Sequence, residues 1–468
     1  MTLAIVPVLI AVLLCAFFPL SDTDIWWHLA CGREWISTWT PVREPVVNVH
    51  EFFQQSVYAV YGVGGAPLLV VFKALLWSLV FYLFLRPVCK EPKGGENYLA
   101  VCVSVILLFV FRYQMEMRPI VFSLVFLGFF WNLLPFVFGT NSKGRKILGI
   151  AVLLLIQWAW CRCQGLYILG PILAFAFVVG RRSWANAALV VALFAMPFLH
   201  SDGLNLFLYP FGLLDRLLGL SPSAAVFASQ IAENRSPFTV AFAGENLLQS
   251  VGMVLVGGVT LVWSVVRLAR RGFCVHYAVL FTVAVMSLVA ERNFVLLMPL
   301  LVLEIFKETS CVPVLKDRRM VAAFVVVCSV FLGLWVKCVK VYDSSMVSYR
   351  RVPVNAALWM KTHPHAGKLF NDDRSGGYLE FVNPADPVFI DGRFILKTRE
   401  FFERYLLYSE QTNLFEEDAA KLDVDRAVFP LRYFSRWENL VQTLERGENW
   451  RLAYVDSLYV IFDRVLLR

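Results

Sequence analysis

Residues 21–35 read Ser21-Asp22-Thr23-Asp24-Ile25-Trp26-Trp27-His28-Leu29-Ala30-Cys31-Gly32-Arg33-Glu34-Trp35. They follow directly on an apolar run from Leu3 to Leu20, which has about the 20 residues that a membrane-spanning helix needs. Two carboxylates and a histidine therefore lie where a first transmembrane helix meets water. Ionisable groups at that depth are unfavourable unless they are paired or used, so this segment is the first candidate for a functional site.

The same segment predicts a helix of its own. Ser21 or Asp22 can cap its N-terminus, and Asp24 falls in the first turn, where a negative charge favours the helix dipole. Helical spacing places Asp24 and His28 on one face. The tryptophans predict that this helix lies on the membrane surface; they are Trp26, Trp27, Trp35 and Trp39. The alternative is that the two aspartates only cap the helix and the tryptophans only form an interfacial belt.

Composition identifies the class of protein. The chain has 468 residues, of which 59% are hydrophobic and 15% aromatic, and its mean hydropathy is +0.64. These values exclude a set of soluble domains and indicate a polytopic membrane protein. The net charge of +8 requires no nucleic-acid partner, because Lys and Arg in a membrane protein mostly mark cytoplasmic loops. Cysteine spacing indicates neither a disulfide framework nor a structural zinc site.

By the length criterion, about eleven apolar stretches predict membrane spans, the first of which we expect to be retained rather than cleaved. They lie near residues 3–20, 66–85, 97–111, 119–138, 147–161, 165–180, 185–200, 247–266, 275–290, 294–306 and 320–337. With a cytoplasmic N-terminus, the inner loops hold fifteen Lys and Arg and the outer loops eight, which satisfies the positive-inside rule.

The eight outer cations are all arginines, namely Arg33, Arg43, Arg112, Arg118, Arg162, Arg216, Arg235 and Arg292. Because the planar guanidinium matches phosphate and carboxylate, they predict an outward-facing anion site. The alternative is that these arginines only bind lipid phosphates.

An odd number of spans puts three segments on the same, extracytoplasmic side: the outer loop 21–62, the outer loop 201–245 and everything after residue 340. In the first, residues 50–62 predict a second surface helix that carries Glu51, and the second loop, too long for a simple connector, carries Glu233. Lys73 lies inside the second apolar run and is a functional candidate by default. Its alternative is a buried structural pair with a carboxylate that the sequence does not identify.

From about residue 350, shorter apolar runs and more charge predict a small α/β domain over residues 341–468, with a partly parallel sheet. Strands are expected at 368–371, 387–391, 426–430, 451–455 and 459–462, and helices near 352–361, 397–407, 411–421 and 435–446. Ligands of open α/β sheets bind beyond the carboxyl ends of strands. Two such ends are polar here and supply Asp372, Asp373, Arg374, Asp391 and Arg393. The alternative at both strand ends is that these residues only form turns.

Several segments together resemble the GT-C glycosyltransferase superfamily, in particular a group of bacterial polytopic proteins that mostly lack an assigned substrate. The first is Asp22-x-Asp24-x-Trp26-Trp27-His28-Leu29-Ala30-x-Gly32-Arg33. The others are Leu68–Leu76 with Lys73-Ala74-Leu75, Arg118-Pro119, Trp160–Gly165, Ile231–Pro237, Asn371–Tyr378 and Phe389-Ile390-Asp391-Gly392-Arg393. They are scattered over nearly the whole chain. Where the resemblance leads us to expect Trp-x-Asn-x-His-Gly, the chain has Trp160-Cys161-Arg162-Cys163-Gln164-Gly165, so a proton-transfer role for that loop is in doubt.

The superfamily includes protein mannosyltransferases, oligosaccharyltransferases and lipid A aminoarabinose transferases. The resemblance implies transfer of a sugar from a polyprenyl-phosphate-linked donor to a glycan, lipid or protein acceptor at the outer face of the cytoplasmic membrane. It also implies an acidic base or metal ligand just after the first span, which here is Asp22 or Asp24.

We therefore expect Asp24 as base, with Asp22 and His28 as orienting partners or ligands of a divalent metal such as Mg²⁺ or Mn²⁺ at Asp22 and Asp24. Donor-phosphate contacts are expected from Lys73, Arg118, Arg162 and Arg292. Acceptor contacts are expected from Glu51, Glu233, Asp372, Asp373, Arg374, Asp391 and Arg393. The alternatives are a non-catalytic scaffold or assembly protein of the same fold and a lipid or sugar transporter or flippase.

Overall fold

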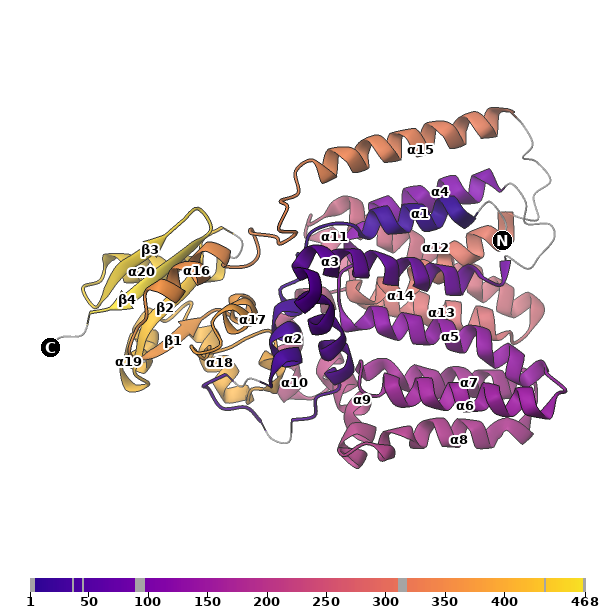
Figure 1. The fold of residues 1–468 in the computed structure, drawn as a ribbon, viewed down its shortest axis with the longest axis horizontal. Helices are drawn as coiled ribbons and strands as arrows, with labels where there is room; N and C mark the ends of the chain where they lie inside the picture. The colour runs from indigo at the N-terminus through magenta and orange to yellow at the C-terminus, as the bar shows by residue number, and fades with distance from the viewer. Residues whose placement is uncertain are drawn as a thin grey trace.

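In the computed structural model, residues 5–35, 38–43, 46–88, 97–309, 318–432 and 435–465 are described. Apolar helices lie side by side as a broad bundle, with a small sheet and its helices at one end (Figure 1). The bundle helices are α1 (Ile5–Ala16), α3 (Glu51–Leu85), α4 (Tyr98–Val110), α5 (Pro119–Gly139), α6 (Lys143–Trp160), α7 (Leu169–Gly180), α8 (Ala187–Ala195), α12 (Leu247–Arg271), α13 (Val275–Val289), α14 (Phe294–Thr309) and α15 (Arg318–Val339). Each of the predicted apolar stretches thus contains a helix.

Among the described residues, four helices are both long and apolar enough to cross a membrane: α3, α5, α12 and residues 320–339 of α15. The α8 region and α9 (Gly203–Leu218) form a pair bent by 109°, which makes a fifth if the pair is one span. The other bundle helices are apolar but shorter or less uniformly apolar. The fifteen cations expected in the inner loops include Lys90, Lys93 and Lys316. These three lysines lie outside the described residues.

Helix α3 combines the predicted surface helix 50–62 with the second apolar stretch. The two halves meet at Gly64 and Gly65, where the backbone leaves helical geometry, with φ of −148° and +63°. The positive φ at Gly65 is a conformation that residues with a side chain rarely adopt. This bend directs the first half of α3 against α2 (Asp24–Arg33), which lies at the end of the bundle nearest the sheet (Figure 1).

Two of the four tryptophans expected at the membrane surface are instead buried in the protein. Trp26 and Trp27 are only 1% and 9% exposed, so they do not form an interfacial belt. Trp26 packs edge-on against Tyr378, with ring centroids 4.7 Å apart, and also contacts Tyr61. Apolar surface is removed from water equally well by protein as by lipid, and here α3 and α17 (Asp373–Val382) cover the helix.

The long outer loop is helical. It contains α9, α10 (Pro222–Gln230), the 3-10 turn η6 (Ala232–Asn234) and α11 (Pro237–Phe242). Helix α10 reaches the C-terminal part: the Phe227 ring stacks on Phe402 at 5.0 Å, and Arg436 donates a hydrogen bond of 2.8 Å to Gln230. The loop therefore connects the bundle to the sheet region.

The sheet has the order β1-β2-β4-β3. Strand β1 (Lys368–Asn371) is parallel to β2 (Val424–Pro430), which is antiparallel to β4 (Tyr459–Arg464), and β4 pairs antiparallel with β3 (Trp450–Val455). The helices are α16 (Val354–Thr362), α17, α18 (Arg399–Leu407), α19 (Thr412–Lys421) and α20 (Glu438–Arg446). Four predicted strands and all four predicted helices of this part are confirmed.

The predicted strand at 387–391 is wrong. Residues 388 and 389 belong to no strand and bond to a side chain and to the first loop instead of a sheet. The Phe389 amide donates to the Asn371 side chain at 2.8 Å, and the Trp39 amide donates to the Val388 carbonyl at 3.1 Å. Helix α17 was not predicted, because its two glycines, Gly376 and Gly377, indicate a turn.

Candidate functional site

Arg118 joins the two outer loops. Its Nε and Nη2 atoms each donate a hydrogen bond of 2.8 Å to the carboxylate of Asp22, just before α2. On the other side the same guanidinium binds Glu233 of η6, through Nη1 and through a second bond of 2.7 Å from Nη2. These paired carboxylates hold the pKa of Arg118 well above its usual value despite burial. Burial opposes ionisation of Glu233, but Arg118 lowers its pKa to about 2.

Asp24 lies beside this ion pair, in the first turn of α2. Burial, reinforced by the charge of Asp22, raises the pKa of Asp24 to about 7, although Arg118 acts in the opposite direction. A carboxyl group that is half ionised near neutral pH can either accept or donate a proton. Asp24 therefore has the protonation behaviour that a general base requires.

Lys73 lies near two carboxyl groups, those of Glu116 and Asp22. Its Nζ is fully buried, donates to the Phe18 carbonyl at 2.9 Å and lies 3.4 Å from the centre of the Phe18 ring. Glu116, which accepts a hydrogen bond from Ser21, is close enough to Lys73 for the two charges to interact. Burial raises the pKa of Glu116, and Lys73 partly opposes this shift. Glu116 is the carboxylate that sequence reasoning left unidentified.

His28 is buried among aromatic rings. Its ring is tilted by 32° against that of Trp27, with ring centroids 3.6 Å apart, and meets His50 and Phe53 edge-on. Burial, followed by the charges of His50 and Arg393, holds the pKa of His28 well below its usual value, so the imidazole is neutral. Burial likewise lowers the pKa of His50 to about 4. Neither ring supplies charge at neutral pH.

Arg292, in the 3-10 turn η7 (Glu291–Asn293), faces the same cluster. Its guanidinium donates a hydrogen bond of 3.1 Å to the side chain of Asn234. Burial lowers its pKa, while Glu233 and Asp24 act to raise it. Within the part of the chain that the structure describes, Arg292 forms no ion pair with a carboxylate, in contrast to Arg118. Its donors are therefore the ones best suited to an incoming anion.

Arg162 is placed outside this cluster. Its guanidinium bonds to Asp202 at 2.7 Å and to the Ser201 hydroxyl at 3.0 Å, and its Nε lies 3.5 Å from Glu51. These contacts hold the loop after α6 against the beginning of the 201–245 loop. Glu51 is thus brought together with Arg162, not with Asp24, and phosphate contact by Arg162 stays a prediction.

Asp372 and Asp373 are the N-terminal residues of α17. The Asp372 carboxylate accepts a hydrogen bond from the Arg374 amide at 3.2 Å, as an N-cap does. Burial and the neighbouring Asp373 raise the pKa of Asp372 to about 6. Asp373 bonds to the Tyr405 hydroxyl at 2.9 Å. These contacts explain both aspartates as structural, and their role in acceptor binding stays a prediction.

Asp391 and Arg393 form a buried ion-pair cluster against α2. Asp391 accepts from the Arg393 amide at 2.7 Å and from its Nε at 2.9 Å, while Arg393 Nη2 is 3.1 Å from both oxygens of Glu380. Burial opposes ionisation of Asp391, but Arg393 lowers its pKa. Arg393 also donates to Cys31 Sγ at 3.1 Å. With no strand at 387–391, Asp391 does not lie at a strand end as predicted.

Gly392 lies between Asp391 and Arg393 in the chain and is in close contact with Asp24. A Cβ atom at position 392 would lie 2.3 Å from Asp24 Oδ1 and 3.1 Å from Trp27 Nε1. At Gly377 of α17, a Cβ would lie 3.0 Å from the Trp27 amide nitrogen. Both distances are too short for a side chain without displacement of a neighbour. The C-terminal part therefore approaches the backbone and carboxylate of α2 directly.

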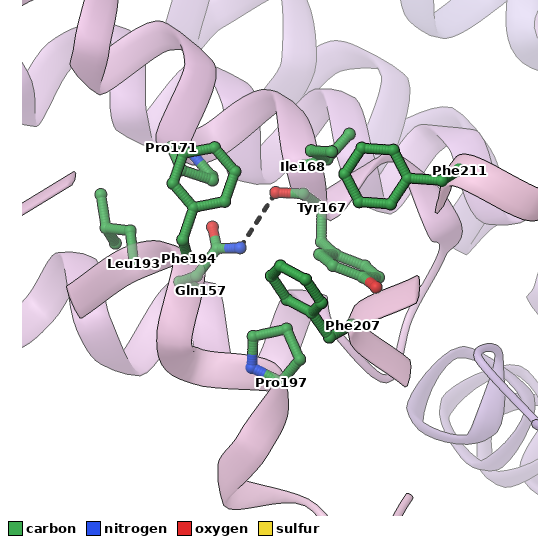
Figure 2. A pocket seen from close by; sticks show the side chains of 9 residues that line it. All are labelled: Gln157, Tyr167, Ile168, Pro171, Leu193, Phe194, Pro197, Phe207 and Phe211. Carbon is green, nitrogen blue, oxygen red and sulfur yellow. Dashed lines mark hydrogen bonds between the residues drawn. The ribbon is translucent and has the colours of Figure 1, made fainter. Parts of the chain in front are cut away.

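A small recess lies elsewhere in the bundle. It is a cavity of about 10 Å³ between α6, η3 (Gly165–Ile168), α7 and α9, room for about one water molecule. Figure 2 shows aromatic rings around Gln157, whose amide donates to the Tyr167 carbonyl at 2.9 Å. Its lining consists of Gln157, Tyr167, Ile168, Pro171, Leu193, Phe194, Pro197, Phe207 and Phe211. It shares no residue with the Asp24 cluster.

In this arrangement Arg118 occupies the carboxylate of Asp22, one of the two ligands expected for a metal. Both oxygens of Asp22 accept hydrogen bonds from Arg118, so a cation there would have to displace a guanidinium. No group of three or more His, Cys, Asp or Glu able to hold a metal occurs among the residues that the structure describes. The arrangement of Asp22 and Asp24 instead favours proton transfer next to a fixed positive charge.

Sequence reasoning missed three contributors to this region, namely Glu116, Glu380 and Gly392. Glu116 lies two residues before Arg118 and gives no periodic signal. Glu380 falls in the unpredicted helix α17. The sequence indicates a turn at Gly392, whereas its neighbours Asp391 and Arg393 are candidate site residues.

No family model and no curated protein matches this sequence. Among solved structures, the chain is similar to the crystal structure of the oligosaccharyltransferase of Archaeoglobus fulgidus in complex with zinc and sulfate. The two share 13% sequence identity with a TM-score of 0.53, over 91% of this chain and 67% of that one. At this identity the likeness establishes the fold alone. The protein therefore has a mostly helical fold similar to that of the archaeal oligosaccharyltransferase.

Proposed function

We propose that this protein is a membrane glycosyltransferase that transfers a sugar from a polyprenyl-phosphate-linked donor to an acceptor at the outer face of the cytoplasmic membrane. In this proposal all eleven apolar stretches are spans, the N-terminus is cytoplasmic, and residues 341–468 form a separate extracytoplasmic domain. The excess of Lys and Arg in the assigned inner loops supports this orientation.

One observation carries the proposal: Asp24, with a pKa of about 7, lies beside the Asp22–Arg118–Glu233 ion pairs, and Arg292 faces the same cluster. A general base is most effective when its pKa is close to the working pH. A departing lipid phosphate needs fixed positive charge close by. Both requirements meet here on elements that the fold holds in place.

In the proposed reaction, ionised Asp24 removes the proton from an acceptor hydroxyl as its oxygen attacks the anomeric carbon of the donor sugar. The bond between that carbon and the phosphate oxygen breaks, and the lipid phosphate leaves with the electron pair. Arg292 donates hydrogen bonds to the phosphate, while Arg118 holds Asp22 beside Asp24 through two hydrogen bonds. No step requires a metal ion, and binding of Mg²⁺ or Mn²⁺ at Asp22 and Asp24 stays a prediction.

The test uses purified full-length protein and a set of polyprenyl-phosphate-linked hexoses and pentoses, with release of polyprenyl phosphate as the readout. Asp24→Asn is expected to lower the rate by about 10²- to 10⁴-fold. It should not lower stability at pH 7, because a carboxyl group whose pKa is raised in the folded state is destabilising once ionised. The matched control is Glu245→Gln, which removes an exposed carboxylate from the same outer loops. Full activity in Asp24→Asn would rule out the base assignment.

The second candidate function is a non-catalytic scaffold. It is favoured by the close contact of Gly392 with Asp24, which fills the space next to the carboxylate, and by the internal pairing of Asp22 and Glu233 with Arg118. A stable protein partner that copurifies with the chain, together with no binding of polyprenyl phosphate, would support the scaffold. Turnover of any lipid-linked sugar would exclude it.

A further inference from the structure

Helix α9 lies across the end of the bundle and not along it. It follows the α8 region at a bend of 109°, after the short break at residues 200–202. A helix that continued through a membrane would be in line with α8, and one that returned would be antiparallel to it. At this angle α9 is closer to perpendicular, and Figure 1 shows it at the end of the bundle nearest the sheet. If α8 crosses a bilayer, α9 therefore lies along its surface.

One side of α9 exposes apolar side chains. Leu204, Leu208 and Phe211 recur at the spacing of a single helix face, and all three are exposed. The opposite side of the helix packs on the protein, where Leu206 is fully buried. Contiguous apolar surface of this kind marks a site of contact with a partner or a membrane.

The acidic residues at the two ends of α9 are bonded within the protein. Asp215, four residues after Phe211, accepts hydrogen bonds of 2.9 Å from the amide and the hydroxyl of Ser221 and so fixes the turn into α10. Asp202, at the beginning of the helix, accepts a hydrogen bond of 2.7 Å from Arg162. No charged residue occurs between these two aspartates. The exposed face of α9 is therefore uncharged.

The other end of the same outer loop presents a second exposed apolar face. Phe238 and Phe242 lie one turn apart on α11, and Phe242 is 90% exposed. Helix α12, which begins five residues later, is one of the helices long and apolar enough to cross a membrane. Its exposed stripe consists of Leu248, Val251, Leu255, Val259 and Val262. The apolar face of α11 thus leads directly into the exposed side of a predicted span.

We propose that α9 and α11 form a lipid-binding surface that lies on the outer leaflet, with their exposed leucines and phenylalanines among the acyl chains nearest the headgroups. The occupant is lipid because each face continues apolar surface that a membrane must cover. On the α9 side this surface includes Phe198 and Leu199, which are exposed at the end of the α8 region. The inference rests on the proposed function in one respect, namely that α8 and α12 are spans.

This placement sets the depth of the arginine cluster. The turn η6 ends at Asn234, three residues before α11 begins. Its Glu233 is bonded to Arg118 and its Asn234 to Arg292. With α11 in the outer leaflet, both guanidinium groups lie at the level of the lipid phosphates. A phosphate attached to a lipid then reaches them sideways, without its apolar chain leaving the bilayer.

The experiment is photo-crosslinking of the full-length protein in vesicles of palmitoyl-oleoyl phosphatidylglycerol. Leu208→p-benzoylphenylalanine and Phe242→p-benzoylphenylalanine, made one at a time, should each gain the mass of one lipid on irradiation, as measured by intact mass spectrometry. The same substitution at Val330, an exposed position in α15, is the positive control. Leu422 is exposed like Leu208 but lies in the C-terminal part, so it is the matched negative control and should gain no lipid.

An adduct at Val330 without adducts at Leu208 and Phe242 would overturn the inference and leave the proposed function standing. A crosslinked dimer from either position would also overturn it, because the face would then bind a second copy of this chain. So would an equal lipid adduct at Leu422. The labelling requires no substrate, so a protein that gains lipid at Leu208 and Phe242 but turns over no lipid-linked sugar would refute the proposed function and leave the lipid-binding surface intact.

Discussion

Arg118 holds Asp22 by two parallel hydrogen bonds of 2.8 Å, and the same guanidinium contacts Glu233. One side chain thus connects the segment before α2, the start of α5 and η6. A bidentate pair of this kind is stronger and more directional than a single contact. It fixes the position of the loop from which Asp24 projects.

Loss of this connection is expected to destabilise the protein. Arg118→Gln leaves the carboxylate of Asp22, which is 4% exposed, without a counter-charge, and should lower the free energy of unfolding by about 3 kcal/mol. Thermal unfolding measures the effect. Arg399→Gln, which breaks an exposed pair with Glu403, is the control and should cost less than about 1 kcal/mol. Equal effects of the two substitutions would show that the Asp22–Arg118 pair is not structural.

The pH dependence of turnover follows from Asp24. Because the base must be ionised, kcat/KM should rise with pH through a midpoint near 7 and level off above it. The residual activity of Asp24→Asn should lack this rise. The measurement is kcat/KM for a polyprenyl-phosphate sugar from pH 5.5 to 8.5, taken as roughly the range over which such a group titrates. A midpoint near 4 in the wild type would mean that Asp24 is solvated or is not the base.

Arg292 is expected to act on donor binding. Arg292→Gln removes the cation that lacks a carboxylate partner among the described residues, and a charged hydrogen bond to phosphate is worth about 1.5 kcal/mol or more. The donor KM should therefore rise about tenfold or more. Arg235→Gln, which removes an exposed pair with Glu245, should change KM little. A fall in kcat at constant KM would place Arg292 in another step.

His365 predicts a pH-dependent stability in the C-terminal part. Its two ring nitrogens lie 2.5 Å from Asp425 and 3.0 Å from Asp386. Burial opposes the charged ring, but the two carboxylates outweigh it and raise the pKa of His365 to about 9. A raised histidine pKa stabilises the fold fully below the unfolded-state value near 6.5 and loses this effect as pH rises towards 9.

The corresponding measurement compares unfolding of the wild type and His365→Gln at about pH 6 and about pH 9.5, values on either side of the two pKa values. The stability difference between the two proteins should be large at the lower pH and small at the higher one. A difference that is independent of pH would show that His365 contributes by packing and not by its charge.

The sequence predicts local structure well where one physical signal dominates. Long apolar runs locate the bundle helices, and short apolar runs locate β1, β2, β3 and β4, because burial requires these patterns. It fails at 387–391, where an apolar segment bonds to Asn371 and Trp39 instead of a strand. It also fails for Trp26 and Trp27, since an aromatic side chain buried by protein and one buried by lipid have the same pattern.

The candidate site is predictable in its residues but not in its pairings. Asp22, Asp24, Arg118 and Glu233 could be selected from composition and position, yet only the structure shows that Arg118 serves both Asp22 and Glu233. Gly392 was unpredictable for a related reason: its importance depends on a contact with a residue far away in the sequence. Spacing along a chain carries no information about such contacts.

The Asp391-Gly392-Arg393 turn lies against α2 and is translated after it. Asp24 leaves the ribosome early, whereas Gly392 and Arg393 are translated about 370 residues later, roughly 20 to 70 s at ordinary elongation rates. Throughout that interval the nascent chain has its first helices but not the turn that contacts Asp24. The close contact between Gly392 and Asp24 can therefore form only after residue 392 has been translated.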